Sequence, residues 1–257
     1  MTLHQEGPFV SFDEVGKVYE DGPRGTALST KERVVSPLQR RSEPTRLLVV
    51  LAVWFFVAIA LGLSGALGAV DRPPIGLAVA MTTPLLAFIV DSWLGAPLFR
   101  QVRALSVPTL VAVQTYRIVG VVFVVAWAQG ALPAAFALPA GLGDVAIGLL
   151  APFVAAAVSR RVPGHRSWAI AWNVAGLADL ISAVFRGVTH TDSVLGIFAT
   201  HPTTDALARY PFSLIPTFLV PTAIILHALA LRELGAGQRG ELPTVSSTAS
   251  GHKAPGA

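Results

Sequence analysis

Six long apolar segments run through this chain, and each is close to the roughly 20 residues that a helix needs to cross about 30 Å of hydrocarbon. The segments are continuous and do not alternate between apolar and polar residues, so they predict helices rather than the strands of a barrel. We therefore expect an all-α protein in which residues 46–233 form a six-helix transmembrane bundle. The expected spans are residues 47–69, 75–94, 107–128, 134–158, 168–187 and 212–231.

The composition supports a membrane protein and excludes several other classes. Hydrophobic residues make up 53% of the chain and charged residues only 13%, whereas about a quarter of an ordinary soluble domain is charged. The basic residues lie at the ends of the apolar segments, where they set orientation, so we expect the lipid bilayer and not nucleic acid as the partner. The chain has no cysteine, which excludes disulfides, thiolate metal sites and cysteine nucleophiles.

The distribution of lysine and arginine predicts that both termini are cytoplasmic. With that orientation twelve basic residues near the spans face the cytoplasm and three face the other side, which is a strong bias under the positive-inside rule. The twelve are Lys31, Arg33, Arg40, Arg41, Arg46, Arg100, Arg103, Arg160, Arg161, Arg166, Arg232 and Arg239, and the three are Arg72, Arg186 and Arg209.

The two ends of the chain differ from its middle. Residues 1–45 are charged and rich in turn-forming residues, and residues 234–257 are rich in Gly, Ser, Thr and Pro, so we expect both to be disordered cytoplasmic tails. The stretch FVSFDEVGKVYEDGPRG at residues 9–25 resembles the opening strand and turn of ABC-transporter ATPase domains. No G-x-x-x-x-G-K-[ST] loop follows it, so we expect no ATPase activity.

Three charged residues lie deep within the apolar segments. Arg117 is ten residues from Val107, which places it about 15 Å deep, and Asp179 lies at a similar depth in the fifth segment. Asp144 is equally deep if its helix begins near Ala134. A lone Arg or Asp at the bilayer centre costs about 2.5–3.5 kcal/mol, so such residues normally face the bundle and pair.

A repeated pentapeptide suggests how these three residues meet. Residues 140–144 read AGLGD and residues 175–179 read AGLAD, so that each carboxylate shares a helix face with small residues that allow a neighbouring helix to approach. The third segment carries Gln114, Arg117 and Gly120 on one face. We therefore expect Arg117 to lie between Asp144 and Asp179, because a guanidinium has enough donors for two carboxylates. Asn173 lies about a turn and a half from Asp179 towards the cytoplasm, and we expect it to extend the polar path from that carboxylate.

This buried polar site has two interpretations. The first is a structural staple that fixes how the helices register, because buried ionic groups are sometimes kept for specificity. The second is functional, since one Arg and two ionised Asp sum to −1, and this charge requires a bound proton, a small cation or a cationic ligand. A titratable carboxylate at mid-membrane is typical of proton relays and coupled transporters.

Other polar residues are weaker candidates. His190, Asp192, His201 and Asp205 lie in one outer loop and could bind a metal, although such loop residues are mostly only solvated. His227 is the only membrane-embedded histidine, and we expect it to have a hydrogen-bonded packing role; no cofactor is expected.

Prolines predict two irregular regions. Pro216 and Pro221 are expected to kink the sixth helix. Residues 132–138, bounded by Pro133 and Pro139, are expected to form a short interfacial helix at the outer mouth.

Three stretches resemble a family of bacterial multi-pass membrane proteins without a functional name: residues 114–155, WNVAGLADLISAV at 172–184 and PFSLIPTFLVPTAIILHALAL at 211–231. The resemblance implies a bacterial inner-membrane protein and no chemistry. From the residues alone we expect a small secondary transporter or proton-linked permease. The alternative is a non-transporting accessory protein or a lipid-facing enzyme, but no enzymatic motif is recognised.

Overall fold

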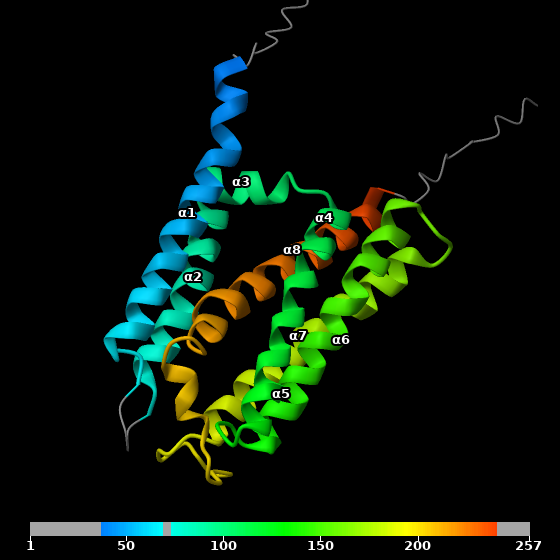
Figure 1. Ribbon diagram of the computed structural model, residues 1–257. Helices are drawn as coiled ribbons and strands as arrows, with labels where there is room; N and C mark the ends of the chain where they lie inside the picture. The colour runs from blue at the N-terminus through cyan, green and yellow to red at the C-terminus, as the bar shows by residue number, and fades with distance from the viewer. Residues whose placement is uncertain (1–36, 69–72, 241–257) are drawn as a thin grey trace, which may run out of the picture. The chain divides into compact units, whose positions relative to one another are not determined.

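The structure is a computed structural model that describes residues 37–68 and 73–240, and Figure 1 shows the course of the chain. Of the two expected tails, residues 1–36 and 241–257 lie outside the described residues, and so does the segment 9–25 that resembles an ATPase domain.

The expected all-α fold is confirmed, since the described residues form helices and no strand. Six of their helical stretches are long and apolar enough to cross a membrane, so the protein is a multi-pass membrane protein. These stretches are Arg46–Ser64, Ile75–Trp93, Val107–Ala128, Ala134–Ser159, His165–Thr189 and Ile215–Ala236.

The helical elements follow one another in the order of these spans. The first two spans belong to α1 (Pro37–Ser64) and α2 (Ile75–Trp93), and the third consists of α4 (Val107–Val113), η1 (Gln114–Gly120) and α5 (Val121–Ala128). The fourth and fifth are α6 (Ala134–Ser159) and α7 (His165–Thr189), and the sixth consists of η3 (Ile215–Leu219) and α8 (Val220–Gly240). Two short helices, α3 (Pro97–Arg103) and η2 (Thr204–Ala208), lie in the connections.

Helix α6 is the centre of the bundle, in contact with α4, η1, α5 and α7, while α8 packs against α7, α4 and α2. In Figure 1 the span of α1 starts, and α8 ends, on one side of the bundle, which we call the terminal side. The connections α1–α2, α5–α6 and α7–η3 lie on the opposite side, which we call the loop side. Only 11% and 6% of the first two spans are buried, against 28–50% of the others, so α1 and α2 are peripheral.

At two prolines inside the spans, the carbonyl that loses its usual helical donor accepts a hydrogen bond from a side chain of another helix. Pro221 cannot donate to the carbonyl of Thr217, which accepts instead from the indole Nε1 of Trp54 at 2.9 Å. Pro139 leaves the carbonyl of Ala135 free, and the guanidinium of Arg186 donates to it at 3.0 Å. Partners of this kind allow proline within a membrane helix.

Several elements differ from the sequence-based expectation. Residues 132–138 do not form a separate interfacial helix: α6 begins at Ala134, directly after Pro133, and passes through Pro139. The bond from Arg186 replaces the backbone donor that Pro139 removes. Helix α8 continues to Gly240, past the expected end of the span, because no proline stops it before Pro243. The short helix α3 was not expected.

Irregular backbone occurs in two spans. The third span is not a continuous α-helix, because η1 is a 3₁₀ stretch at its middle. The sixth span begins with a π-helical stretch, η3, which contains Pro216 and precedes Pro221, so the irregularity expected there from the prolines is present.

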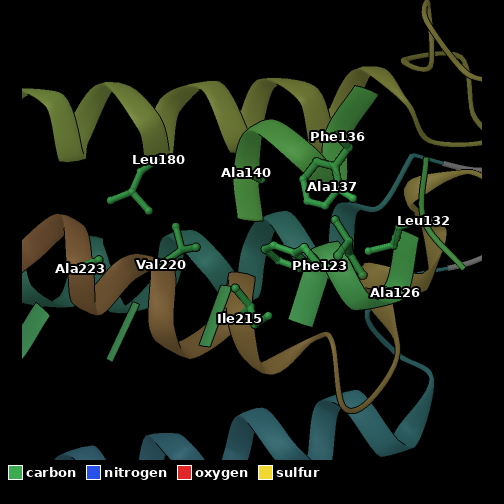
Figure 2. Close-up of a cluster of buried hydrophobic side chains, with 11 residues drawn as sticks. Phe123, Ala126, Leu132, Phe136, Ala137, Ala140, Leu180, Ile215, Val220 and Ala223 are labelled. Carbon is green, nitrogen blue, oxygen red and sulfur yellow. The ribbon is translucent and has the colours of Figure 1, made fainter. Parts of the chain in front are cut away.

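Buried apolar side chains gather in separate clusters. The largest joins α5, α6, α7, η3 and α8 towards the loop side and includes Phe123, Phe136, Leu180 and Ile215 (Figure 2). Two further clusters fill the half of the bundle towards the terminal side. They are built from Phe99, Val102, Leu110, Leu226, Leu229 and Ala230, and from Val111, Ile147, Ala151, Ala155 and Trp172.

Candidate functional site

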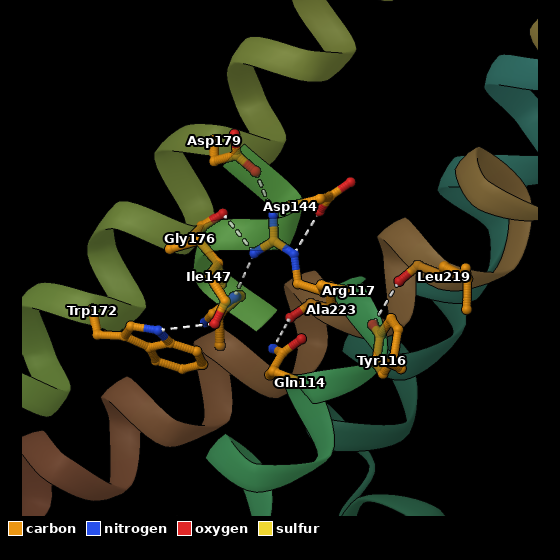
Figure 3. Close-up of polar contacts among 11 residues, drawn as sticks. Gln114, Tyr116, Arg117, Asp144, Ile147, Trp172, Gly176, Asp179, Leu219 and Ala223 are labelled. Carbon is orange, nitrogen blue, oxygen red and sulfur yellow. Dashed lines mark hydrogen bonds and ion pairs between the residues drawn. The ribbon is translucent and has the colours of Figure 1, made fainter. Parts of the chain in front are cut away.

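Arg117 lies in η1, at the middle of the third span, and its side chain is only 2% exposed. Its Nε donates to Asp144 Oδ1 at 2.7 Å, and its Nη2 donates to Asp179 Oδ2 at 2.5 Å (Figure 3). The contacts expected from the sequence are therefore present, with one guanidinium shared between carboxylates from α6 and α7. Charge-assisted bonds of this kind are among the strongest available in a protein.

The remaining nitrogen of the guanidinium determines the protonation of His227. Arg117 Nη1 lies 3.3 Å from the carbonyl of Gly176 and 3.1 Å from His227 Nε2. Because arginine can only donate, Nε2 must carry the lone pair, and the ring proton is on Nδ1, which donates to Asn173 Oδ1 at 2.8 Å. Histidine is then neutral, and the cluster sums to −1 when both carboxylates are ionised.

Glycines make this close approach possible. A Cβ on Gly120 would overlap the side chain of Asp144, and one on Gly176 would overlap the ring of His227. A Cβ on Gly143 would overlap Asp179 Oδ1, and one on Gly148 would lie 2.7 Å from the backbone nitrogen of Ile118. The small residues beside the two aspartates thus have a direct role, since any side chain there would displace an ionic contact or a neighbouring backbone.

Two predicted site residues lie close to the cluster without touching the carboxylates. Gln114 Nε2 donates to the carbonyl of Ala223 at 3.1 Å, so this side chain joins the third span to α8. Asn173 contacts His227 and, through Nδ2, the carbonyl of Ala169 at 2.7 Å. It therefore supports the histidine and does not continue a polar path from Asp179.

A cavity of about 380 Å³ reaches the cluster from the loop side. It extends from the exposed Arg209 to Asp144 and is bounded by α2 on one side and α7 on the other. A second cavity of about 20 Å³ adjoins it and is lined by Arg117, Tyr116 and Asp144. A space of this size holds about one water molecule where polar partners are present. Asp179 lines neither cavity.

The loop residues considered as metal ligands have other partners. His190 is buried, with Nδ1 2.9 Å from the carbonyl of Arg186, and Asp205 Oδ2 accepts from the backbone N–H of Asp192 at 3.0 Å and from Thr203 at 2.7 Å. Across residues 37–68 and 73–240, no three His, Cys, Asp or Glu side chains gather in a way that could hold a metal ion.

Sequence reasoning missed three participants. His227 was expected to have a hydrogen-bonded packing role, and it does bond to Asn173 and pack against Trp172 with ring centroids 5.1 Å apart, but its contact with the central guanidinium was not expected. Tyr116 donates from its hydroxyl to the carbonyl of Leu219 at 2.9 Å. Gly143 was overlooked because it lies off the face of Asp144. The signal that was available for His227 was its position well inside an apolar segment, whereas His165 lies at the very start of its span.

The comparisons with known proteins give the family. Residues 74–235, more than half of the 257-residue chain, match a family described as a domain of unknown function, DUF8737. The chain belongs to this family. The DUF8737 region runs from just before α2 into α8 and contains every residue of the Arg117 cluster, whereas α1 lies outside it. This match confirms the expectation of a family without a functional name. No curated protein and no solved structure matches the chain.

Proposed function

We propose that this protein is a small secondary transporter, a proton-linked permease, of a bacterial inner membrane, with both termini cytoplasmic. One observation carries the proposal: Asp144 is ion-paired to Arg117 within the bundle and also lines the cavity that comes from the loop side. A carboxylate that only stapled helices together would need no such access. Asp144 is the group that takes up a proton or small cation, while Arg117 and Asp179 set its charge environment.

One-sided access supports this proposal. The cavity lies towards the loop side of Asp144, while Val111, Ile147 and Ala151 pack together on the terminal side of the cluster. A site open to one side and closed to the other is the arrangement expected for one state of an alternating-access transporter. In the proposed orientation this state faces outward.

The irregular backbone also supports transport. Tyr116 in η1 bonds to the carbonyl of Leu219 in η3, so the 3₁₀ and π stretches are joined beside the site. Of the two stretches, η1 lies at the middle of its span, where broken helices are typical of transporter binding sites, and 3₁₀ stretches within helices often mark hinges.

The second candidate is a structural role, in an accessory protein or a lipid-facing enzyme. The observation that favours it is the completeness of the contacts around Arg117, whose three nitrogens all have partners and whose side chain is 2% exposed. In a structural role, the paired guanidinium of Arg117 only holds the helices together. Loss of this ion pair then lowers the stability of the protein without changing access to the site.

Accessibility of single cysteines separates the two candidates, and the chain contains no native cysteine to remove. Ala183→Cys places a thiol in the cavity wall, and Ala151→Cys places one in the packed terminal-side cluster. Each variant is made alone and with Asp144→Asn, which imitates a protonated carboxyl. The proteins are reconstituted in oriented vesicles and treated with a membrane-impermeant maleimide from either side.

For a transporter we expect the Ala183→Cys thiol to react from the loop side and the Ala151→Cys thiol to be protected. Adding Asp144→Asn, or acidifying the buffer, should slow the first reaction and expose the second thiol to the terminal side. If both rates stay unchanged while Asp144→Asn lowers only the thermal stability, the cluster is a staple and the proposed function is wrong.

A further inference from the structure

We propose that the 380 Å³ cavity binds a hydrophobic organic monocation whose protonated amine pairs with Asp144. This deepens the proposed function, since it names a substrate class for the same site, and the role in transport rests on that function. The binding itself requires only the cavity and the charge of the cluster.

The charge of the site selects a cation. Arg117 from η1 bonds to Asp144, Tyr116 lines the small cavity beside it, and Asp179 from α7 and His227 from α8 contact the same guanidinium. Arginine contributes +1, the histidine is neutral because Nε2 accepts from Arg117, and the two aspartates contribute −2 when ionised. One negative charge is therefore uncompensated in a low-dielectric region, where it strongly favours a positive partner.

The geometry of Asp144 leaves room for that partner. Its Oδ1 accepts from Arg117, while its other oxygen, Oδ2, is directed away from the guanidinium (Figure 3). Its side chain is 12% exposed, and the residue lines both cavities. An amine that reached the deep end of the larger cavity could thus donate to this carboxylate without breaking the ion pair with Arg117.

The walls of the cavity favour a ligand whose remaining part, beyond the amine, is apolar. Between the loop-side rim and Asp144 the lining is formed by Phe123, Phe136, Leu180, Val184 and Ile215, among other apolar residues. The rings of Phe123 and Phe136 pack edge to face with centroids 5.1 Å apart and present aromatic surface. A volume of 380 Å³ lies within the range of about 300–1,000 Å³ that is usual for small-molecule sites.

The same walls disfavour the other ion classes. A bare metal cation needs several oxygen or nitrogen ligands, and the described residues contain no cluster of His, Cys, Asp or Glu that could supply them. An anion would meet the uncompensated negative charge at the deep end. Among the described residues that line the wall, the one arginine is Arg209, which is exposed and lies at the rim, where Asp205 also lines the cavity.

Three ligands of similar shape test the proposal. They are 4-phenylbutylamine, which is cationic at neutral pH, the neutral 4-phenylbutanol, and the anionic 4-phenylbutyrate. Binding of each is measured to the full chain in lipid nanodiscs without any gradient, with empty nanodiscs subtracted. The variants are Asp144→Asn, Ala183→Phe, which fills the cavity wall, and Glu233→Gln, a matched loss of one carboxylate that bonds to Arg103 outside the cavity.

We expect the amine to bind the wild-type protein at least about tenfold more tightly than the alcohol, as for a hydrogen bond to a charged group, and the acid to bind weakest. Asp144→Asn should remove this preference, Ala183→Phe should weaken both amine and alcohol, and Glu233→Gln should change nothing. Equal binding of amine and alcohol to the wild-type protein, or preferred binding of the acid, overturns the proposal even if no variant folds.

The two proposals fail separately. Amine selectivity without any change in cysteine accessibility would leave a ligand-binding membrane protein that does not transport. A change in accessibility without amine selectivity would leave a transporter of a different substrate.

Discussion

Single residues decide whether a charged cluster can exist inside this bundle. Arg117 has a partner at each guanidinium nitrogen, and each partner is brought close by a glycine or by the backbone of a glycine. The arrangement therefore depends as much on missing side chains as on the charges. Two predictions follow at this scale.

Replacing the arginine alone should lower the free energy of unfolding more than replacing it together with one carboxylate. Arg117→Leu leaves Asp144 and Asp179 buried without a counter-charge, and breaking a buried pair in this way costs about 3–5 kcal/mol. Arg117→Leu with Asp144→Leu removes one of the two orphaned charges and should recover part of the loss. Unfolding of the single and double variants in mixed micelles gives the coupling energy. Additive effects would show that the two groups do not pair.

Adding one methyl group beside Asp179 should loosen the cluster. In Gly143→Ala the new Cβ would overlap Asp179 Oδ1, so either the carboxylate or the helix must shift, at a cost of about 1–3 kcal/mol. Gly235→Ala is the control, because it lies within α8 with no atom near its Cβ and should be neutral or stabilise by about 0.5–1 kcal/mol. Thermal unfolding of both variants measures the difference, and equal effects would contradict the close contact.

At the scale of helices, irregular backbone is tolerated where another helix supplies a donor. The π stretch η3 and the following Pro221 leave the sixth span without its regular ladder, and Trp54 and Tyr116 donate to the carbonyls of Thr217 and Leu219. These bonds link α1 and η1 to the same irregular segment. The peripheral helix α1 is therefore bonded to the bundle at the irregular segment η3 of the sixth span.

The bond from Trp54 should matter only while Pro221 is present. Trp54→Phe removes the indole donor and should destabilise the protein by about 1 kcal/mol, the usual net value of one hydrogen bond. In a Pro221→Ala background the alanine N–H can reach the carbonyl of Thr217, so the same change should cost much less. A double-mutant cycle of unfolding free energies tests this compensation, and an unchanged cost would mean that Trp54 acts only by packing.

The elements that were predictable are those set by local hydrophobicity. Six spans follow from the sequence because the length of an apolar run is a local property. The defects η1 and η3, and the continuity of α6 through Pro139, depend on side chains far along the chain, such as Arg186 for Ala135. Helix α3 was missed because seven residues with Arg100 and Arg103 carry little apolar signal.

Part of the candidate site could also be predicted from the local hydrophobicity of the sequence, because charged residues stand out within apolar segments. Arg117, Asp144 and Asp179 could be paired because a charge in hydrocarbon must find a partner. His227 and Tyr116 could not be assigned, because their contacts depend on how α7, α8 and η3 pack around the third span.

In the molecule as a whole, most buried residues of the spans belong to the four later ones. Helix α2 is peripheral and forms the outer wall of the cavity. Helix α2 is held in this place by its contacts with α3, η3 and α8. The basic residues on the terminal side predict that this side faces the cytoplasm.

Labelling of whole cells should show which side is cytoplasmic. Val194→Cys, in the loop after α7, is 82% exposed, and Val162→Cys, between α6 and α7, is 38% exposed. We expect an impermeant maleimide to label the first in intact cells and the second only after the membrane is opened, as the positive-inside rule requires. The reverse pattern would invert the proposed topology.

The depth of Asp144 makes the site sensitive to voltage. Helix α6 begins at Ala134, so the ten residues to Asp144 cover about 15 Å of the roughly 30 Å hydrocarbon layer. A charge that crosses the whole layer changes energy by about 2.3 kcal/mol per 100 mV, so a cation arriving at Asp144 would sense at most about half of that. With the loop side outside, as proposed, an inside-negative potential would strengthen its binding from that side, and the cell's electrical polarity would set how often the site is filled.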